Sequence, residues 1–188
     1  MHNYHDVHRR LPPAVVYGED GTPLLSWRVL MLPYVGEREL YEEFKLDEPW
    51  DSPHNIRLLP KIPAVFKPPA RRARKMQPHD TVIHVFVGKG TAFEEGRAIR
   101  LKEDFPDGTS STILMVEGGP PVPWTKPEEI PFAPEAPLPN LFNLFGDTLR
   151  IAFADGSVRY FGPEISETTL RAIITRNGGE SLNPDGND

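Results

Sequence analysis

The chain contains no cysteine among its 188 residues. Thiol catalysis, iron–sulfur ligation and disulfide bonds are therefore excluded. No apolar run approaches the roughly 20 residues that a membrane-spanning helix needs, and the first ten residues, MHNYHDVHRR, lack the apolar core of a signal peptide. These 188 residues are thus expected to be soluble and to make no membrane contact of their own.

Positive charge is also scarce. The chain has 27 acidic residues against 21 lysines and arginines, which gives a formal net charge of −6. Nucleic acids and anionic membranes attract clustered positive charge, so this balance disfavours both as partners. The one basic run, residues 71 to 75, lies near prolines and is interpreted as a solvated loop.

Proline is abundant, with 22 residues, and predicts short elements joined by rigid loops. The length fits one domain with a core of its own. We expect that domain over residues 1–178, followed by a flexible tail over 179–188.

Helical periodicity and capping signals recur along the chain. Ser26 is a candidate N-cap for a helix that Pro33 interrupts, and Asp51 is a candidate N-cap for another helix that ends before Pro60. The expected helix over residues 1–10 looks like the last turns of a longer helix. At the other end of the chain, Asn177-Gly178 is a candidate stop for the final helix. The expected helices cover residues 1–10, 27–34, 37–44, a short turn after 51–53, and 167–176.

Alternating and β-branched runs predict strands over 81–87, 98–102, 111–117, 148–154 and 157–161. Gly118-Gly119 is expected to end the third strand, and the proline-rich segment 120–139 is expected to form a loop without regular pairing. Asp155-Gly156 predicts a two-residue type I′ hairpin. The order of elements indicates an α+β fold, with short helices packed on an antiparallel sheet, a closing hairpin and a C-terminal helix.

Several segments resemble one family in the same order. They are HNYHD at 2–6, LPPA at 11–14, LLSWRVLMLPYV at 24–35, LDEPWDSPHN at 46–55, VGKGTAFE at 87–94, DGTSSTILMVE at 107–117, VPWTKPEEI at 122–130 and FADGSVRYF at 153–161. Over residues 1–178 the chain is similar to a bacterial domain of unknown function, also catalogued as a type-10 solute-binding domain. The resemblance implies a pseudopilin-like fold, an inner-membrane anchor formed by a prepilin-type N-terminal helix, and a domain in the periplasm or at the cell surface.

The chain departs from the family pattern in three respects. It begins where the anchoring helix of family members usually runs into the HNYHD segment, so either that helix was removed or this protein never had one. Many members also have a histidine ahead of the hairpin Asp-Gly where this chain has Phe145, so no role of that histidine is carried over. The cysteines common in the family are missing as well.

Two groups of side chains are candidate metal sites. Asp47, Glu48 and Asp51 place three carboxylates within five residues, and such hard oxygen ligands suit calcium, with His54 close by. The plainer interpretation makes Asp51 a helix cap. His2, His5 and His8 are spaced by one helical turn and would suit zinc, copper or nickel, although the plainer interpretation is that these side chains pack and hydrogen-bond against the following loop.

Tryptophan residues are candidates for ligand binding. Trp27 is interpreted as a core residue, whereas Trp50 and Trp124 lie in loops and could stack on a sugar or peptide. The candidate ligand site consists of these two loop tryptophans, Trp50 and Trp124, together with Asp47, Glu48, Asp51 and His54.

Three functions follow from these observations. The first is a non-enzymatic pseudopilin-like domain for surface or secretion-related assembly and recognition, with protein partners or self-assembly and no cofactor. The second is a module that binds a small polar solute or glycan. The third and weakest is a hydrolase that uses a carboxylate of the acidic loop with His54.

Overall fold

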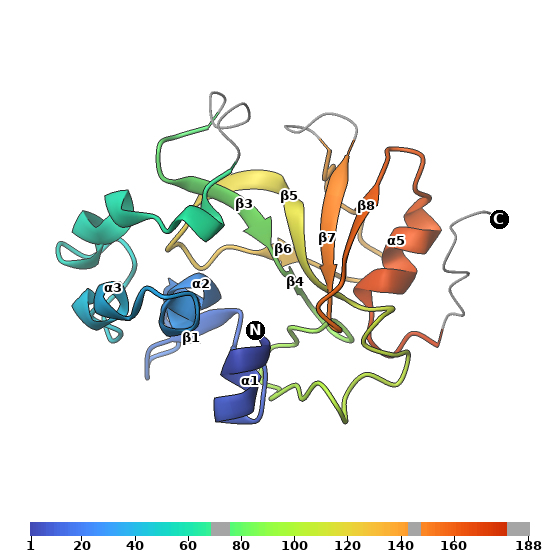
Figure 1. Cartoon of the computed structure of the whole chain (residues 1–188), viewed down its shortest axis with the longest axis horizontal. Helices are drawn as coiled ribbons and strands as arrows, with labels where there is room; N and C mark the ends of the chain where they lie inside the picture. Colours follow the sequence, from blue (N-terminus) through green and yellow to red (C-terminus); the bar gives the residue numbers. More distant parts are fainter. Residues whose placement is uncertain (69–75, 143–147, 180–188) are drawn as a thin grey trace. The chain divides into compact units, whose positions relative to one another are not determined.

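The computed structural model describes residues 1–68, 76–142 and 148–179. Its helices and antiparallel strands confirm the α+β fold (Figure 1). Its internal contacts divide into two compact units, one made of residues 1–82 and 121–128 and the other of residues 83–120 and 129–188. The division falls inside two strands, β3 (Asp80–His84) and β5 (Ile113–Pro123).

The first unit is mainly helical. It contains α1 (His2–His8), α2 (Trp27–Met31), α3 (Arg38–Glu43), the 3₁₀ turns η1 (Leu32–Tyr34), η2 (Asn55–Lys61) and η3 (Ala64–Phe66), and the antiparallel strands β1 (Val15–Tyr17) and β2 (Pro23–Ser26). Ser26 caps α2 as predicted, because its hydroxyl accepts a hydrogen bond from the Arg28 backbone. Pro33 coincides with the change from α-helix to 3₁₀ turn.

Four aromatic rings form the centre of the first unit. Trp27 meets Phe66 edge to face, Phe66 stacks on Trp124, and Trp124 meets Phe44 edge to face, with successive ring centroids about 6 Å apart. All four rings are buried. Edge-to-face and offset contacts of this kind add stability beyond the burial of apolar area.

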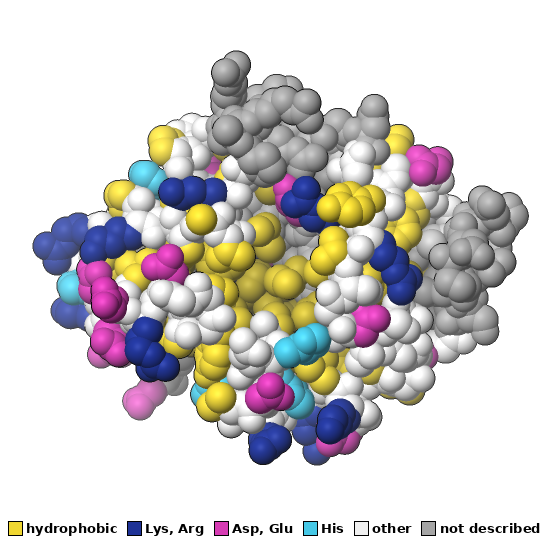
Figure 2. Space-filling model, in the orientation of Figure 1, with side chains coloured by type: hydrophobic (Ala, Val, Ile, Leu, Met, Phe, Trp, Pro, Cys, Tyr) yellow, Lys and Arg dark blue, Asp and Glu magenta, His cyan; other side chains and the backbone are white. Residues whose placement is uncertain are grey.

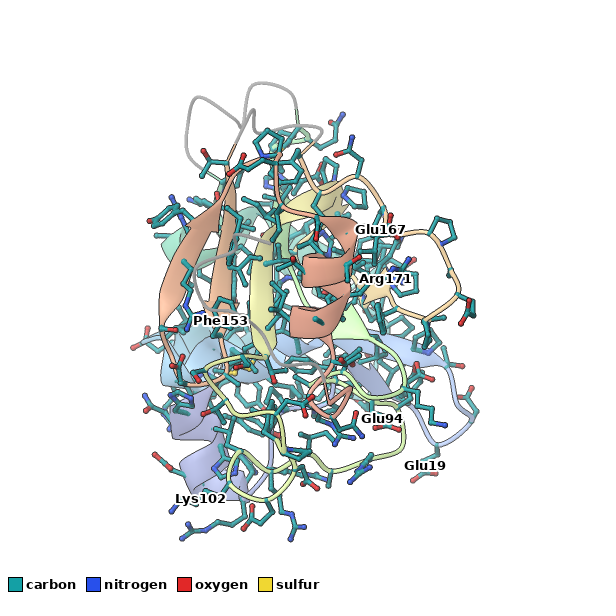
Figure 3. All side chains as sticks on the ribbon, turned by 90° about the vertical axis from the view of Figure 1, so that its right-hand side faces the viewer. Glu19, Glu94, Lys102, Phe153, Glu167 and Arg171 are labelled. Atoms are coloured by element: carbon teal, nitrogen blue, oxygen red, sulfur yellow. The ribbon has the colours of Figure 1, made fainter. Side chains whose placement is uncertain are left out.

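The second unit contains most of a four-stranded sheet in the order β3-β5-β7-β8, where β7 is Leu149–Phe153 and β8 is Val158–Phe161. β5 pairs antiparallel with β7, and β7 pairs antiparallel with β8. The helix α5 (Glu167–Ile174) lies along one face of these strands, as Figures 1 and 3 show. Its buried side chains share a core with the strands: Leu170, Ile173, Ile174, Ile113, Val116, Leu149, Ile151 and Phe153.

The proline-rich segment 120–139 is more regular than expected. β6 (Ile130–Pro131) pairs in parallel with β4 (Phe86–Val87), a pairing that the sequence did not predict. Further along, the guanidinium of Arg171 donates to the carbonyls of Pro134 and Ala136 and pairs with Glu167 (Figure 3). Proline has no backbone N–H to donate, but its carbonyl can still accept a hydrogen bond. The bonds from Arg171 to carbonyls therefore fix this segment in place although it has few backbone donors.

A buried arginine closes the second unit. Arg176 donates from Nε to the carbonyl of Thr91 and from Nη1 to the carbonyl of Asp104. Its Nη2 lies 2.6 Å from a carboxylate oxygen of Glu94, which compensates its charge. The segment just after α5 is therefore bound to the loop over residues 91–104.

Three sequence predictions of strand and helix limits are wrong. Residues 98–102 are not a strand: 98–100 have no regular structure and 101–102 lie in a turn, where Asp104 accepts hydrogen bonds from the Arg100 backbone and side chain. η2 begins at Asn55 without a cap from Asp51, and it includes Pro60, which a short 3₁₀ turn tolerates. α5 ends at Ile174, because Thr175 turns extended and bridges to Thr91.

β5 also differs from its prediction, because it continues through Gly118-Gly119 to Pro123. A Cβ on Gly118 would lie 2.7 Å from the Leu141 carbonyl oxygen, and Gly119 has a φ of 86°. The two glycines thus permit close backbone approach within the strand and do not end it.

The β7–β8 hairpin confirms its predicted position, but its turn is different. Gly156 has a positive φ and Asp155 does not, which excludes type I′. Phe153 N–H donates to Ser157, and Gly156 N–H donates to Phe153, as in a three-residue loop that ends with a left-handed glycine. The predicted tail from 180 onward and Phe145 lie outside the described residues.

The hairpin loop makes stability depend on pH through Asp155. The Ser157 side chain and the Ser157 backbone N–H, which donates to a carboxylate oxygen of Asp155 at 2.8 Å, lower the pKa of the Asp155 carboxyl below its usual value. The carboxylate therefore stabilises the fold above the unfolded pKa of about 4, and this contribution is lost as pH falls through the lower folded pKa.

We expect Asp155→Ala to lower the urea midpoint at pH 7, with a difference from wild type that shrinks as the pH falls below 4. Asp155→Asn is the matched control, because its amide oxygen still accepts from Ser157 at every pH. A difference between wild type and Asp155→Ala that is constant from pH 7 to pH 2 would contradict this role of the charge.

Candidate functional site

The acidic loop over residues 46–55 is organised around one buried amide. Asn55 is fully buried, and its side-chain oxygen accepts from the Lys45 N–H. Its side-chain nitrogen donates to the carbonyls of Lys45, Glu48 and Pro49 at 2.9 to 3.1 Å. One side chain therefore satisfies backbone groups from both ends of the loop, which fixes its curvature.

The carboxylate of Glu48 is used inside this loop. One oxygen accepts from Lys45 Nζ and the other from the Ser52 hydroxyl. Both hydrogen bonds lower the pKa of the Glu48 carboxyl, and the bond from Lys45 has the larger effect. Asp47 and Asp51 are exposed, and nowhere in the described ranges do three or more His, Cys, Asp or Glu side chains gather in a way that could hold a metal ion. The structure thus does not bring Asp47, Glu48 and Asp51 together as a calcium site.

His54 and Trp50, two further residues of the candidate ligand site, anchor the acidic loop. His54 Nε2 lies 2.8 Å from the carbonyl oxygen of Glu43, at the end of α3. Trp50 is half-buried, and its backbone N–H donates to the Leu24 carbonyl in β2. Both residues therefore connect the loop to neighbouring elements of the first unit.

The N-terminal histidines lie on α1, and His8 packs against aromatic side chains. The ring of His8 stacks on Tyr4 at 4.0 Å, and its Nε2 lies 2.8 Å from the Tyr34 hydroxyl. Burial raises the pKa of Tyr4. His2 and His5 do not join His8 in a metal-binding group within the described part of the chain.

Trp124 is placed differently from its prediction. Its ring is 0% exposed, lies between Phe44 and Phe66, and donates from Nε1 to the Leu59 carbonyl at 2.9 Å. The prediction of an exposed Trp124 that stacks on a ligand is therefore wrong. The segment around it pairs with neighbouring backbone, because Trp124 N–H donates to His79, and this pairing turns the indole into the aromatic core.

Sequence reasoning missed the surface that β5, β7 and β8 present on the side opposite α5. Side chains alternate along each strand, so the residues between the core positions point to that outer face. The strand register places them in two rows that cross the sheet. The apolar row is Met115, Ala152 and Val158, and the charged row is Glu117, Arg150 and Tyr160. We call these six residues the β7–β8 surface.

The charged row joins an ion pair to an exposed ring. Arg150 Nη1 lies 2.6 Å from a carboxylate oxygen of Glu117, and its guanidinium carbon lies 5.5 Å from the centre of the Tyr160 ring. Exposure rises across the row, from 9% for Glu117 to 45% for Arg150 and 63% for Tyr160. Figure 2 shows hydrophobic and basic side chains next to each other over β7 and β8.

The comparisons with known proteins identify a family. A family model described as "Protein of unknown function (DUF1559)", and also catalogued as a type-10 bacterial solute-binding domain, matches residues 1–136. The chain belongs to the DUF1559 family. No curated protein and no solved structure gives a significant match.

The DUF1559 match includes the acidic loop and Trp124, and it ends before the β7–β8 hairpin. Two segments that carried the resemblance have structural roles in this DUF1559 chain. Asn55 organises the LDEPWDSPHN segment, and Trp124 completes the aromatic core. Within the described ranges, no helix combines the length and the apolarity that crossing a membrane requires.

The role of Asn55 in this DUF1559 loop can be tested by substitution. We expect Asn55→Ala to lower the free energy of unfolding by about 3 kcal/mol, since each buried carbonyl left without a donor costs about 1–3 kcal/mol. Urea unfolding measures the loss. Asp51→Ala is the matched control in the same loop, with an expected change within about 0.5 kcal/mol because Asp51 is exposed.

Equal losses in the two variants would contradict the central role of Asn55. A calcium-dependent rise in the melting temperature that Asp51→Ala abolishes would instead assign the loop to ion binding.

Proposed function

We propose that this DUF1559 chain is a non-enzymatic recognition and assembly domain of the pseudopilin-like type, working outside the cytoplasm. In this proposal the β7–β8 surface contacts protein partners. The compartment and the pseudopilin-like character come from the family resemblance. The use of the β7–β8 surface comes from its exposed side chains.

The observation that carries the proposal is the arrangement of exposed apolar groups. Seven large hydrophobic side chains are exposed in the described part of the chain. Five of them, Val7, Tyr17, Val35, Ile56 and Val65, lie in separate elements or loops of the first unit. The other two, Val158 and Tyr160, are two residues apart on β8 and point to the same face.

The chemistry of the surface favours protein recognition. Tyrosine and arginine are enriched among interface residues that contribute most to binding, because they combine apolar area with polar groups. Glu117 compensates the charge of Arg150, so a partner that covers Arg150 does not leave an unpaired cation. The Arg150 guanidinium also makes a cation–π contact with the exposed Tyr160 ring.

Solute binding receives less support from the same residues. That alternative required the loops of Trp50 and Trp124 to offer indole rings to a ligand, and the Trp124 ring is buried among other aromatic rings. The hydrolase alternative required Asp47, Glu48 or Asp51 to act with His54 in a sheltered site, whereas the Glu48 carboxylate is bound by Lys45 and Ser52 and both aspartates are exposed to solvent.

The proposal can be tested by selecting peptides on the wild-type chain from a randomised library. We expect selected peptides to lose about tenfold or more in affinity for Tyr160→Ala, the size of loss that truncating an interface aromatic residue causes. Arg150→Ala should reduce affinity in the same direction. Fluorescence polarisation measures each dissociation constant.

Tyr17→Ala is the matched control, because Tyr17 is also an exposed tyrosine on a strand but belongs to the first unit. Peptides that bind Tyr160→Ala as tightly as wild type, or that lose affinity only for Tyr17→Ala, would sink the assignment of recognition to this surface.

A further inference from the structure

Along β8, the backbone N–H and C=O groups of successive residues point alternately toward β7 and away from it. Phe153 N–H donates to the Ser157 carbonyl and so begins the ladder between β7 and β8. Hydrogen-bonded pairs alternate in an antiparallel ladder, so the next such pairs are Ile151 with Arg159 and Leu149 with Phe161. The N–H and C=O groups of Val158 and Tyr160 consequently point away from β7.

These outward groups lie on an edge strand, because β8 is last in the order β3-β5-β7-β8. No residue that the structure describes pairs with the backbone of Val158 or Tyr160 on this side. Edge strands usually carry lysine, proline or other groups that prevent further pairing. The segment Val158–Phe161 has neither lysine nor proline, and its exposed side chains, Val158 and Tyr160, are apolar or aromatic. Its one charged side chain, Arg159, lies on the α5 face of the sheet, with its guanidinium carbon 4.3 Å from the centre of the Phe153 ring.

We propose that a second copy of this chain adds to the sheet at β8, antiparallel to the first, with a two-fold axis through Tyr160. The proposal rests on the assembly role proposed above and names its partner. The β3-β5-β7-β8 sheet would then continue into the β8-β7-β5-β3 sheet of the second copy.

Charge selects this register over its neighbour. A two-fold axis perpendicular to the sheet keeps α5 of both copies on one side, and the two axes that pair most residues of the four-residue strand β8 pass through Arg159 or through Tyr160. An axis through Arg159 places the two Arg159 side chains directly opposite each other, which is destabilising. An axis through Tyr160 pairs the two tyrosines and places Arg159 opposite Phe161 of the second copy.

The Tyr160 register also matches the hydrogen-bonding directions. The two Tyr160 residues exchange N–H to C=O hydrogen bonds, because both groups point outward in each copy. Val158 then lies opposite Gly162 of the second copy. On the outer face, the charged row becomes continuous and symmetric, in the order Glu117, Arg150, Tyr160, Tyr160, Arg150, Glu117.

The absence of cysteine allows a specific test of this register. In Tyr160→Cys the two Cα atoms would be about 5.5 Å apart, which a disulfide can bridge. In Val158→Cys, the matched control, they are offset by four residues, about 14 Å along the strand, which is beyond disulfide reach. We expect mild oxidation to give a covalent dimer of Tyr160→Cys and to leave Val158→Cys monomeric on a non-reducing gel.

Sedimentation of the unmodified chain over a concentration series provides the second measurement. We expect a monomer–dimer equilibrium that shifts to monomer in Tyr160→Lys, since lysine on an edge strand opposes pairing. The same shift is expected in Val158→Pro, which removes an outward N–H without removing a bond to β7.

Cross-linking of both cysteine variants or of neither would overturn the proposed register, as would a wild-type chain that remains monomeric at every concentration. The peptide selection decides the recognition role separately, because it measures binding to the exposed side chains of a single copy. Peptide binding that depends on Tyr160 without any dimer would reject the second copy and retain the recognition role.

Discussion

The continuity of β5 past two glycines is the constraint on which much of the structure depends. Gly118 brings the strand against the Leu141 carbonyl, and Gly119 adopts a backbone conformation that other residues rarely adopt. Because the strand continues, the Pro120 carbonyl reaches the ring nitrogen Nε2 of buried His84. The same strand leads directly to Trp124, whose ring completes the aromatic core of the first unit.

The two faces of the sheet in the second unit follow from one alternation of side chains. Core positions on β5 and β7 meet α5, and the positions between them form the β7–β8 surface. That surface combines a nearly buried carboxylate, a half-exposed guanidinium and an exposed ring. Such an order, with charge compensated within the sheet and aromatic area at its edge, suits contact with another protein more than capture of a small ion.

Local signals in the sequence predicted local structure well. Ser26 caps its helix and the Asp155-Gly156 dipeptide marks the hairpin, as predicted, because these effects depend on a few neighbouring residues. Long-range effects were not predictable in this way. The burial of Trp124 depends on Leu59, and the use of Gly118 depends on Leu141, residues that no local pattern connects with them.

The candidate sites show the same limit. Acidic and histidine clusters are conspicuous in a sequence, yet Glu48 and His8 bind neighbouring protein groups. Asn55, which organises the acidic loop, carries no charge and attracts little attention by residue type. The β7–β8 surface consists of ordinary residues that become neighbours only through strand register, although the alternation in residues 149–161 was a usable signal.

The hydrogen bonds of Arg176 have a consequence for the time course of folding. Its partners Thr91, Glu94 and Asp104 precede it by 85, 82 and 72 residues, so these contacts have high sequence separation. During synthesis, the loop over residues 91–104 emerges long before the arginine that binds it. Closing so long a loop costs entropy before any contact is gained, which slows this step relative to formation of the local helices. The contacts that bind this loop to Arg176 can therefore form only after α5 has been synthesised.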